Sequence, residues 1–209
     1  MEFTLDDGIF LTKIARDAIE NYIKNHIVID IPKNTPEKLF RKRGVFVTLN
    51  TIKNGHVNLR GCIGRPYPDF PLIRATIDSA IDSAVNDPRF YPLSIDELEH
   101  IVVEISILTK PILIEVNNPN EYLDKIKIGE DGLIISKGWL KGLLLPQVPV
   151  EWKWNVKEFL DNLCMKAGMY YNCWKDPNIK IYKFNAIIYG EIAPKGKIVE
   201  NPHLYYKRN

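Results

Sequence analysis

A cysteine close to two arginines is the feature of this sequence with the clearest chemical potential. Cys62 lies two positions after Arg60 and three positions before Arg65. Positive charge near a thiol favours the thiolate, the nucleophilic and metal-binding form, and lowers the thiol pKa below its usual value of about 8.5. We therefore predict that Cys62 is a nucleophile or thiol ligand and that the two arginines orient an anionic substrate.

The thiol belongs to a hexapeptide with a glycine on each side, Leu59-Arg60-Gly61-Cys62-Ile63-Gly64. Glycine in or near a strand lets a second backbone or a ligand approach closely, or permits a bulge. Gly61 and Gly64 are therefore candidates for substrate binding. The alternative is that Cys62 is a small buried apolar residue and that the glycines serve only a tight turn.

Strand alternation predicts which side chains accompany the thiol. In an extended segment, every second side chain points to the same face. Regular alternation would place a polar row on one face: His56, Asn58, Arg60 and Cys62. Because His56 and Cys62 would be about 20 Å apart along such a strand, His56 is not expected to be the base of a Cys–His dyad. His100 or Glu151 could approach the thiol through the fold, but the spacing does not identify the base.

Helices and hairpins alternate along the chain and must position these residues. Apolar residues at intervals of three and four predict helices over residues 6–25, 71–86 and 155–167. Thr4 and Asp7 have the spacing of a capping pair, and Gly168 suits the left-handed end of the last helix. Asn54-Gly55 is a strong hairpin signal between strands expected at residues 45–49 and 56–63.

The remaining expected elements are short. Ser94 and Glu97 have capping-box spacing, and Asp131-Gly132 marks a second hairpin. A short helix is expected at residues 119–125, and strands at residues 101–108, 126–128, 133–136, 179–184 and 186–191. Hairpins require antiparallel pairing, so the sequence predicts an α+β fold with a mainly antiparallel sheet and flanking helices.

Composition indicates an ordinary folded protein without a strong charge preference. The 209 residues are 45% hydrophobic and 26% charged, and the formal net charge is +2. This balance implies neither a nucleic-acid backbone nor an anionic membrane as a partner. No run approaches the ~20 apolar residues of a membrane span, and the first residues are acidic, so we expect a cytoplasmic protein.

Cysteine and histidine spacing gives no sign of a metal site. The three cysteines form no Cys-x-x-Cys pair, and the four histidines are far apart in the sequence. We therefore expect three free thiols and no structural metal, and no particular cofactor is indicated. Cys164 is on the apolar side of the helix expected at residues 155–167, which favours a core position, and Cys173 is expected to be incidental.

Four further polar residues are candidates for site or structural roles. Gln147 and Glu151 lie between an apolar run and the last helix, and both are candidates for substrate binding. Glu151 is equally compatible with a carboxylate favoured by a helix dipole. Asp87 and Arg89 follow the second helix, where an aspartate before proline is first of all a turn former, so a structural role is favoured for them.

The hexapeptide resembles the signature of the AMMECR family (Alport syndrome, midface hypoplasia and elliptocytosis chromosomal region). The similarity extends over about residues 8–191 in ordered blocks. These blocks are Asp87-Pro88-Arg89-Phe90 with Pro92, Glu97-Leu98, Ile105-Ser106-Ile107-Leu108, Gly129, Gly132-Leu133, and Leu145-Pro146-Gln147-Val148 with Glu151 and Trp154.

The resemblance implies a single AMMECR-like domain over residues 1–209 with two subdomains around a cleft near the hexapeptide. We expect a larger subdomain of residues 1–115 with 155–209 and a smaller one of residues 116–154. The family has no established reaction. Its association with Memo-like and radical-SAM proteins implies such proteins as partners but names no substrate.

Two functions are compatible with these residues. The first is an intracellular enzyme that acts on a small anionic molecule, with Cys62 as the catalytic residue and Arg60 and Arg65 as substrate ligands. The second is a non-catalytic binding or regulatory module that uses the same cleft for a partner protein or metabolite. In the second case the thiol is dispensable and Arg60 is not.

Overall fold

The chain forms two compact units in the computed structural model, which describes residues 3–53 and 55–205 apart from the side chains of Lys53 and Glu151. The first unit comprises Met1–Leu108 and Ile187–Asn209, and the second comprises Thr109–Ala186. The sequence had assigned residues 155–186 to the larger part. The structure assigns them to the second unit, because the apolar side of the helix there packs into that unit's core.

A five-stranded sheet in the order β2-β1-β3-β8-β9 is the centre of the first unit. Its strands are β1 (Val45–Lys53), β2 (His56–Arg65), β3 (Ile101–Leu108), β8 (Ala186–Glu191) and β9 (Ile198–Glu200). β1 pairs antiparallel with both β2 and β3, and β8 pairs antiparallel with β9. β1 and β2 are the predicted hairpin strands, while Asn54 of their turn lies outside the described residues.

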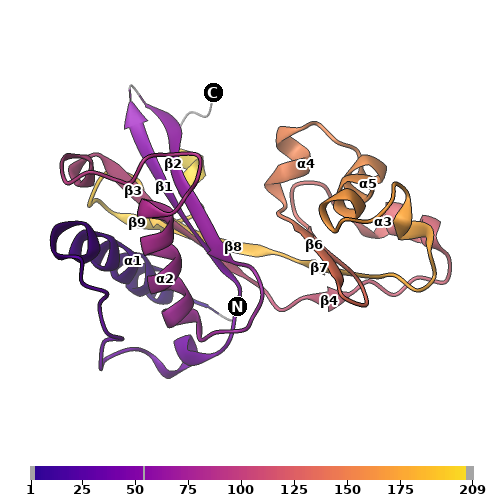
Figure 1. Cartoon of the computed structure of the whole chain (residues 1–209), viewed down its shortest axis with the longest axis horizontal. Coiled ribbons are helices and arrows are strands. Elements are labelled where there is room, and N and C mark those ends of the chain that lie inside the picture. The colour runs from indigo at the N-terminus through magenta and orange to yellow at the C-terminus, as the bar shows by residue number, and fades with distance from the viewer. Residues whose placement is uncertain (1–2, 54, 206–209) are drawn as a thin grey trace. The chain divides into compact units, whose positions relative to one another are not determined.

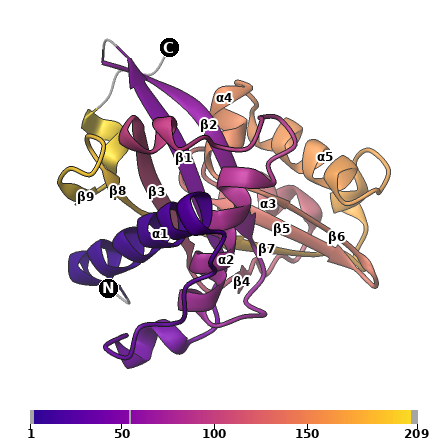
Figure 2. The same ribbon diagram turned by 60° about the vertical axis from the view of Figure 1, so that its left-hand side comes forward.

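Two helices, α1 (Leu5–Asn25) and α2 (Leu72–Val85), lie on one face of this sheet (Figures 1 and 2). Thr4 and Asp7 form the predicted capping box of α1. The helices bury regularly spaced apolar residues against β1 and β3: Leu11, Ala15, Ile19, Ile73, Ile77 and Ala80. Short 3-10 helices complete the unit: η1 (Glu37–Phe40), η2 (Asp96–Glu99) and η5 (Pro202–Tyr205).

A buried ion pair connects α1 to the sheet. Arg16 is 7% exposed and Glu191 is 3% exposed, and Arg16 donates from Nε to Oε1 of Glu191 over 2.6 Å. Nη2 of Arg16 also donates to the carbonyl of Ile101 over 2.9 Å, and Oε2 of Glu191 accepts the backbone N–H of Val103 over 3.0 Å. The pair therefore holds α1, β3 and β8 together.

The second unit contains a four-stranded antiparallel sheet in the order β4-β7-β5-β6. Its strands are β4 (Ile112–Leu113), β5 (Gly132–Lys137), β6 (Leu140–Leu144) and β7 (Lys180–Phe184), and its helices are η3 (Pro119–Glu121), α3 (Tyr122–Lys125), α4 (Gln147–Glu151), α5 (Val156–Lys166) and η4 (Cys173–Lys175). Asn155 caps α5. Gly168 has a φ of +70°, as the sequence predicted. The antiparallel sheets and interspersed helices confirm the predicted α+β fold.

Two local predictions in the second unit are wrong. Residues 126–128 are not a strand, because the chain turns there: the N–H of Asp131 donates to the carbonyl of Lys127, and the Asp131 carboxylate accepts the N–H of Lys127. Asp131 therefore closes this turn instead of opening a hairpin. The hairpin lies between β5 and β6, where Gly138 has a φ of +57°.

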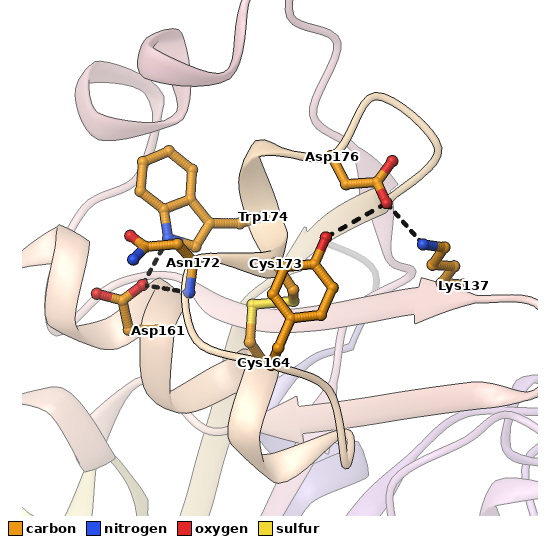
Figure 3. Close-up of a disulfide and its surroundings, with 8 residues drawn as sticks. Lys137, Asp161, Cys164, Asn172, Cys173, Trp174 and Asp176 are labelled. Carbon is orange, nitrogen blue, oxygen red and sulfur yellow. Dashed lines mark hydrogen bonds and ion pairs between the residues drawn. A yellow bond between two sulfur atoms is a disulfide. The ribbon is translucent and has the colours of Figure 1, made fainter.

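The prediction of three free thiols is also wrong. Cys164 and Cys173 form a disulfide (Figure 3). Both residues are completely buried in the core of the second unit, where the chain returns from α5 to η4 and brings them together. Cys62 is the free cysteine of the chain. In the described ranges, no helix is both long and apolar enough to cross a membrane.

Replacement of Glu191 by Ala is expected to destabilise the first unit strongly. The change removes the buried counter-charge of the Arg16 guanidinium and leaves only the Glu20 carboxylate, 3.6 Å away, to pair with it. Breaking a buried pair in this way typically costs about 3–5 kcal/mol. Glu99→Ala is the matched control, because Glu99 is 63% exposed in its ion pair with Lys195 and solvent screens such surface pairs, so that they contribute little to stability. Urea unfolding measures both losses, and equal losses would contradict the role given to the buried pair.

Candidate functional site

The hexapeptide lies in β2, an edge strand, and contains a β-bulge. Leu49 pairs with Gly61, but the next residue of β1, Asn50, pairs with Leu59. Arg60 is therefore the extra residue of the bulge. Because paired residues share a face and β1 is regular here, the bulge turns Leu59 to the face of Cys62.

Because of the bulge, the predicted polar row does not lie on one face of the strand. Thr51 pairs with Asn58, and Leu49 pairs with Gly61, so Asn58 lies on the face of Gly61, which the helices cover. Cys62 lies on the opposite face. The row of four polar side chains expected from regular alternation is thus divided between the two faces, because one inserted residue reverses the alternation.

A different polar row crosses the sheet at the thiol. Thr48 pairs with Cys62 on one side and with Glu104 of β3 on the other, so these three side chains share a face. Oγ1 of Thr48 donates to Sγ of Cys62 over 3.3 Å. Thiol, hydroxyl and carboxylate therefore follow one another across three adjacent strands.

Gly61 allows α2 to approach the sheet. A Cβ atom at Gly61 would lie 2.1 Å from the carbonyl oxygen of Ser83 in α2. At this contact, the Ser83 hydroxyl accepts the N–H of Ile63 over 2.8 Å and lies 2.7 Å from the carbonyl oxygen of Val47. The side chain of Ser83 therefore connects α2 to both strands of the hairpin beside the hexapeptide.

Gly64 is also explained by packing within the chain. A Cβ atom there would lie 2.4 Å from the ring of Phe46 and 2.5 Å from the carbonyl oxygen of Val45. Neither glycine is in the left-handed region of backbone conformation. What both positions require is the space that a side chain would occupy.

Asp87 and Arg89 hold the outer edge of β2 at Cys62. The Asp87 carboxylate, 4% exposed, accepts the N–H of Cys62 over 2.8 Å. Arg89 donates to the same carboxylate from Nε over 3.0 Å and from Nη2 over 2.7 Å, and Nη2 also donates to the carbonyl of Cys62 over 3.3 Å. The pair therefore satisfies both backbone groups that Cys62 presents at the edge of the sheet.

Arg60 and Arg65 have carboxylate partners of their own. Arg60 donates to both oxygens of Glu97, over 2.6 and 3.0 Å. Arg65 donates to Asp82 over 2.9 Å and to the hydroxyl of Ser79 over 3.0 Å. The hydrogen bonds from Arg60 hold the pKa of Glu97 at about 2. The charges predicted to activate the thiol are thus engaged in ion pairs with η2 and α2.

The thiol of Cys62 is not activated in the way the sequence suggested. Burial raises its pKa above the ordinary value, and the carboxylates of Asp87 and Glu104 raise it further. The Thr48 hydroxyl and the positive charge of Arg89 act in the opposite direction without outweighing them. At neutral pH, Cys62 is therefore a protonated thiol.

Phe90 provides an aromatic surface next to two guanidinium groups. The guanidinium carbon of Arg60 lies 5.8 Å from the ring centroid, and that of Arg89 lies 5.5 Å from it. These distances suit cation–π interactions. The aromatic ring thus connects the bulge of β2 to the segment that follows α2.

The two candidates from the later part of the chain belong to the second unit. Gln147 is the first residue of α4 and is exposed, and Glu151 is its last residue, with a side chain outside the described part of the structure. The structure brings the other five candidates together in β2: Arg60, Gly61, Cys62, Gly64 and Arg65. The described residues contain no group of three or more His, Cys, Asp or Glu side chains that could hold a metal ion.

Four residues near the thiol were missed or assigned otherwise from sequence. Asp87 and Arg89 were interpreted as turn residues, although an edge strand needs partners for its outward N–H and C=O groups. Thr48 follows three apolar residues in β1, and Glu104 is one of two polar residues in β3. That signal was present in the sequence, but only the strand register shows that they lie beside Cys62.

Comparison with known proteins gives one consistent result. A family model described as AMMECR1 matches residues 12–189. Protein PH0010 from Pyrococcus horikoshii is 52% identical over 205 residues, covering 97% of this chain and 99% of that protein. Protein MJ0810 from Methanocaldococcus jannaschii is 51% identical over 198 residues, covering 94% and 96%. The crystal structure of the uncharacterized protein PH0010 matches with a TM-score of 0.85 and 50% identity, over 97% of this chain and 100% of that one.

Acid unfolding is expected to reveal the role of Asp87. Hydrogen bonds from Arg89 lower the pKa of Asp87 from 3.8 to about 2 against the effect of burial, with help from the N–H of Cys62. A carboxylate with a lowered pKa stabilises the fold at every pH above its pKa in the unfolded chain. This stabilisation is lost as the pH falls from about 4 through about 2. Asp87→Asn should therefore lose less stability across this window than the parent chain.

Urea unfolding at several pH values measures this difference, and Arg89→Met is the companion variant. Loss of the guanidinium should raise the pKa of Asp87 and shift its contribution to higher pH. Parallel stability profiles for the parent chain and Asp87→Asn between pH 4 and 2 would show that this carboxylate does not hold the edge of β2.

Alkylation of Cys62 by iodoacetamide is expected to be slow at neutral pH and to accelerate above the usual titration range of a thiol. Glu104→Gln should speed the reaction at pH 8, because that carboxylate raises the pKa of the thiol. Arg89→Met should slow it, because the guanidinium lowers the pKa. An alkylation rate that has already reached its plateau at pH 7 would show that Cys62 is the reactive thiolate predicted from sequence.

Proposed function

This chain belongs to the AMMECR1 family, and from that starting point we propose that it binds a small anionic molecule at the outer edge of β2, beside Cys62. The observation that carries the proposal is the guanidinium of Arg89. Its side chain is 53% exposed although Asp87 fixes its orientation. A pre-oriented and exposed guanidinium is well suited to bind a carboxylate or phosphate.

The hydrogen bonds of Arg89 leave one nitrogen for a ligand. Nε and Nη2 donate to Asp87 and to the carbonyl of Cys62. Nη1 has no acceptor among the described residues. Because the planar fork is already immobilised by Asp87, a ligand oxygen that reaches Nη1 does not have to order the side chain first.

The proposal gives Cys62 the role of a neutral contact. Its raised pKa supports a thiol that keeps its proton while the ligand is bound. A neutral thiol is a weak hydrogen-bond donor and a polarisable surface. Arg60 orders the segment through Glu97 and Phe90. Gly61 and Gly64 contribute through the backbone shape that they permit.

Catalysis at Cys62 is the second candidate function, and one observation favours it. Both Thr48 and Arg89 act to lower the pKa of the thiol. A ligand that drew Asp87 and Glu104 away would leave burial as the one influence that raises the pKa of the thiol. The thiol would then lose its proton more readily and become a nucleophile. For Gln147 and Glu151, which belong to the second unit, substrate binding remains a prediction from the sequence. A cytoplasmic location and a partnership with Memo-like or radical-SAM proteins remain predictions from the sequence and the resemblance.

Arg89→Ala is expected to weaken anion binding by about tenfold or more, because a hydrogen bond to a charged group typically contributes about 1.5–3 kcal/mol. The probes are inorganic phosphate and acetate, titrated into the full chain while the Arg side-chain NMR signals are followed. Arg65→Ala is the matched control, since Arg65 is committed to Asp82 and Ser79.

Arg89→Lys separates charge from geometry in the same titration, since lysine keeps the charge but lacks the planar fork. Thermal unfolding of each variant confirms that the first unit remains folded. An equal loss of affinity in Arg65→Ala, or undiminished binding in Arg89→Ala, would contradict the proposed site. Retained binding in Cys62→Ser supports the neutral-contact role over the catalytic one.

A further inference from the structure

The disulfide of the second unit closes a short segment that returns from α5 to η4. Cys164 lies in the last turns of α5, and Cys173 is the first residue of η4. Between them, Gly168 and Asn172 have positive φ values of 70° and 63°. The segment therefore reverses direction through two left-handed residues, and the disulfide joins its ends (Figure 3).

A buried carboxylate connects the same two elements without a covalent bond. Asp161, one turn before Cys164 in α5, is completely buried. Its Oδ1 accepts the Nε1–H of Trp174 over 2.8 Å and the N–H of Asn172 over 3.2 Å. Figure 3 shows Asp161 and the disulfide side by side between these elements. We call the disulfide and the Asp161 hydrogen bonds together the α5–η4 clasp.

The carboxylate depends on the returning segment. Burial alone would raise the pKa of Asp161, but hydrogen bonds from Lys157, Trp174 and Tyr171 outweigh it and lower the pKa. Two of these donors, Trp174 and Tyr171, come from the segment that the disulfide ties down. Opening the segment would leave a carboxylate in the core without these donors, which is unfavourable.

Both sulfur atoms are inaccessible in the closed segment. Cys164 and Cys173 are each 0% exposed and belong to the core of the second unit. A thiolate must reach a disulfide sulfur to attack it. Reduction therefore requires the segment to open first, and the hydrogen bonds of Asp161 oppose that opening.

We propose that the α5–η4 clasp is a redox-sensitive device: a dithiol reductant reaches it through local opening, and its reduction loosens residues 165–176 while the first unit stays folded. A thiolate of the reductant attacks one sulfur of the disulfide, which forms a mixed disulfide and releases the other cysteine. The second thiol of the reductant then attacks the mixed disulfide and releases the remaining cysteine. The reductant ends as a disulfide, and Cys164 and Cys173 each receive one electron and one proton.

Reduction of the disulfide is expected to affect only the second unit, because each unit has its own core. The clasp packs with Phe159, Leu163 and Ile181, and the core of the first unit shares no residue with it. A disulfide that closes a short loop stabilises the folded state mainly by limiting the conformations of the unfolded chain. Its loss should therefore increase local opening around η4 and leave the α1 and α2 amides protected.

Thiol counting on the full chain tests the premise. In denaturant without reductant, iodoacetamide and mass spectrometry should find one modified cysteine, Cys62; after dithiothreitol they should find three. Hydrogen exchange of the folded protein then tests the device. Reduction should raise exchange in residues 165–176 without changing exchange in α1 and α2, and should lower the unfolding temperature of the second unit by about 6 °C or more.

Matched variants test whether the hydrogen bonds of Asp161 oppose opening of the segment. Asp161→Asn should be reduced by dithiothreitol about tenfold faster or more than the parent chain, since charge-assisted hydrogen bonds that oppose opening are weakened. Lys166→Ala, an exposed position on the same helix, should be reduced at the parental rate. A Cys164→Ala/Cys173→Ala variant should reproduce the exchange pattern of the reduced chain, and Cys62→Ala should not.

Three results would overturn the proposal. Alkylation of three cysteines without reductant would show that the clasp is not formed. Unchanged exchange in residues 165–176 after reduction would show that the disulfide does not hold the segment. Equal acceleration of exchange in both units would show a global effect in place of a local one.

Discussion

The backbone N–H of Cys62 points away from its sheet, and the Asp87 carboxylate accepts it. This hydrogen bond determines most of the candidate site. It satisfies a donor on an edge strand that would otherwise be available to another chain. The bond is stronger to an ionised carboxylate, and Arg89 favours that form by lowering the pKa of Asp87. The orientation of Arg89 and the position of Cys62 therefore depend on a carboxylate that follows α2.

The same helix fixes β2 from the other side. The backbone of α2 at Ser83 occupies the space that a side chain at Gly61 would need, and the Ser83 hydroxyl bonds to both strands of the hairpin. The hexapeptide that resembles the family signature is thus also a packing motif. Its glycines admit a helix and an aromatic ring, and its bulge turns Arg60 toward Glu97.

The second unit is stabilised by different means. Beside its apolar packing, its core contains a disulfide and a buried carboxylate with donors from three side chains, whereas the first unit combines apolar packing with the buried Arg16–Glu191 pair. The family model spans both units, from residue 12 to residue 189. Within that span the chain leaves the first unit after Leu108 and returns at Ile187, so each unit forms a core from a different part of the chain.

The sequence by itself determined the long helices and most of the strands, because these depend on local patterns. Apolar periodicity predicted the long helices, the Thr4–Asp7 pair marked the start of α1, Gly168 marked the end of α5, and the ordered blocks identified the family. Register, partner choice and burial are non-local, and only the tertiary structure decided them. One inserted residue at Arg60 reversed the predicted faces, three carboxylates changed the expected partners of the arginines, and the return to η4 paired two cysteines that spacing had left free. The thiol pKa depends on the sum of such contacts, which is why charge along the sequence predicted it in the wrong direction.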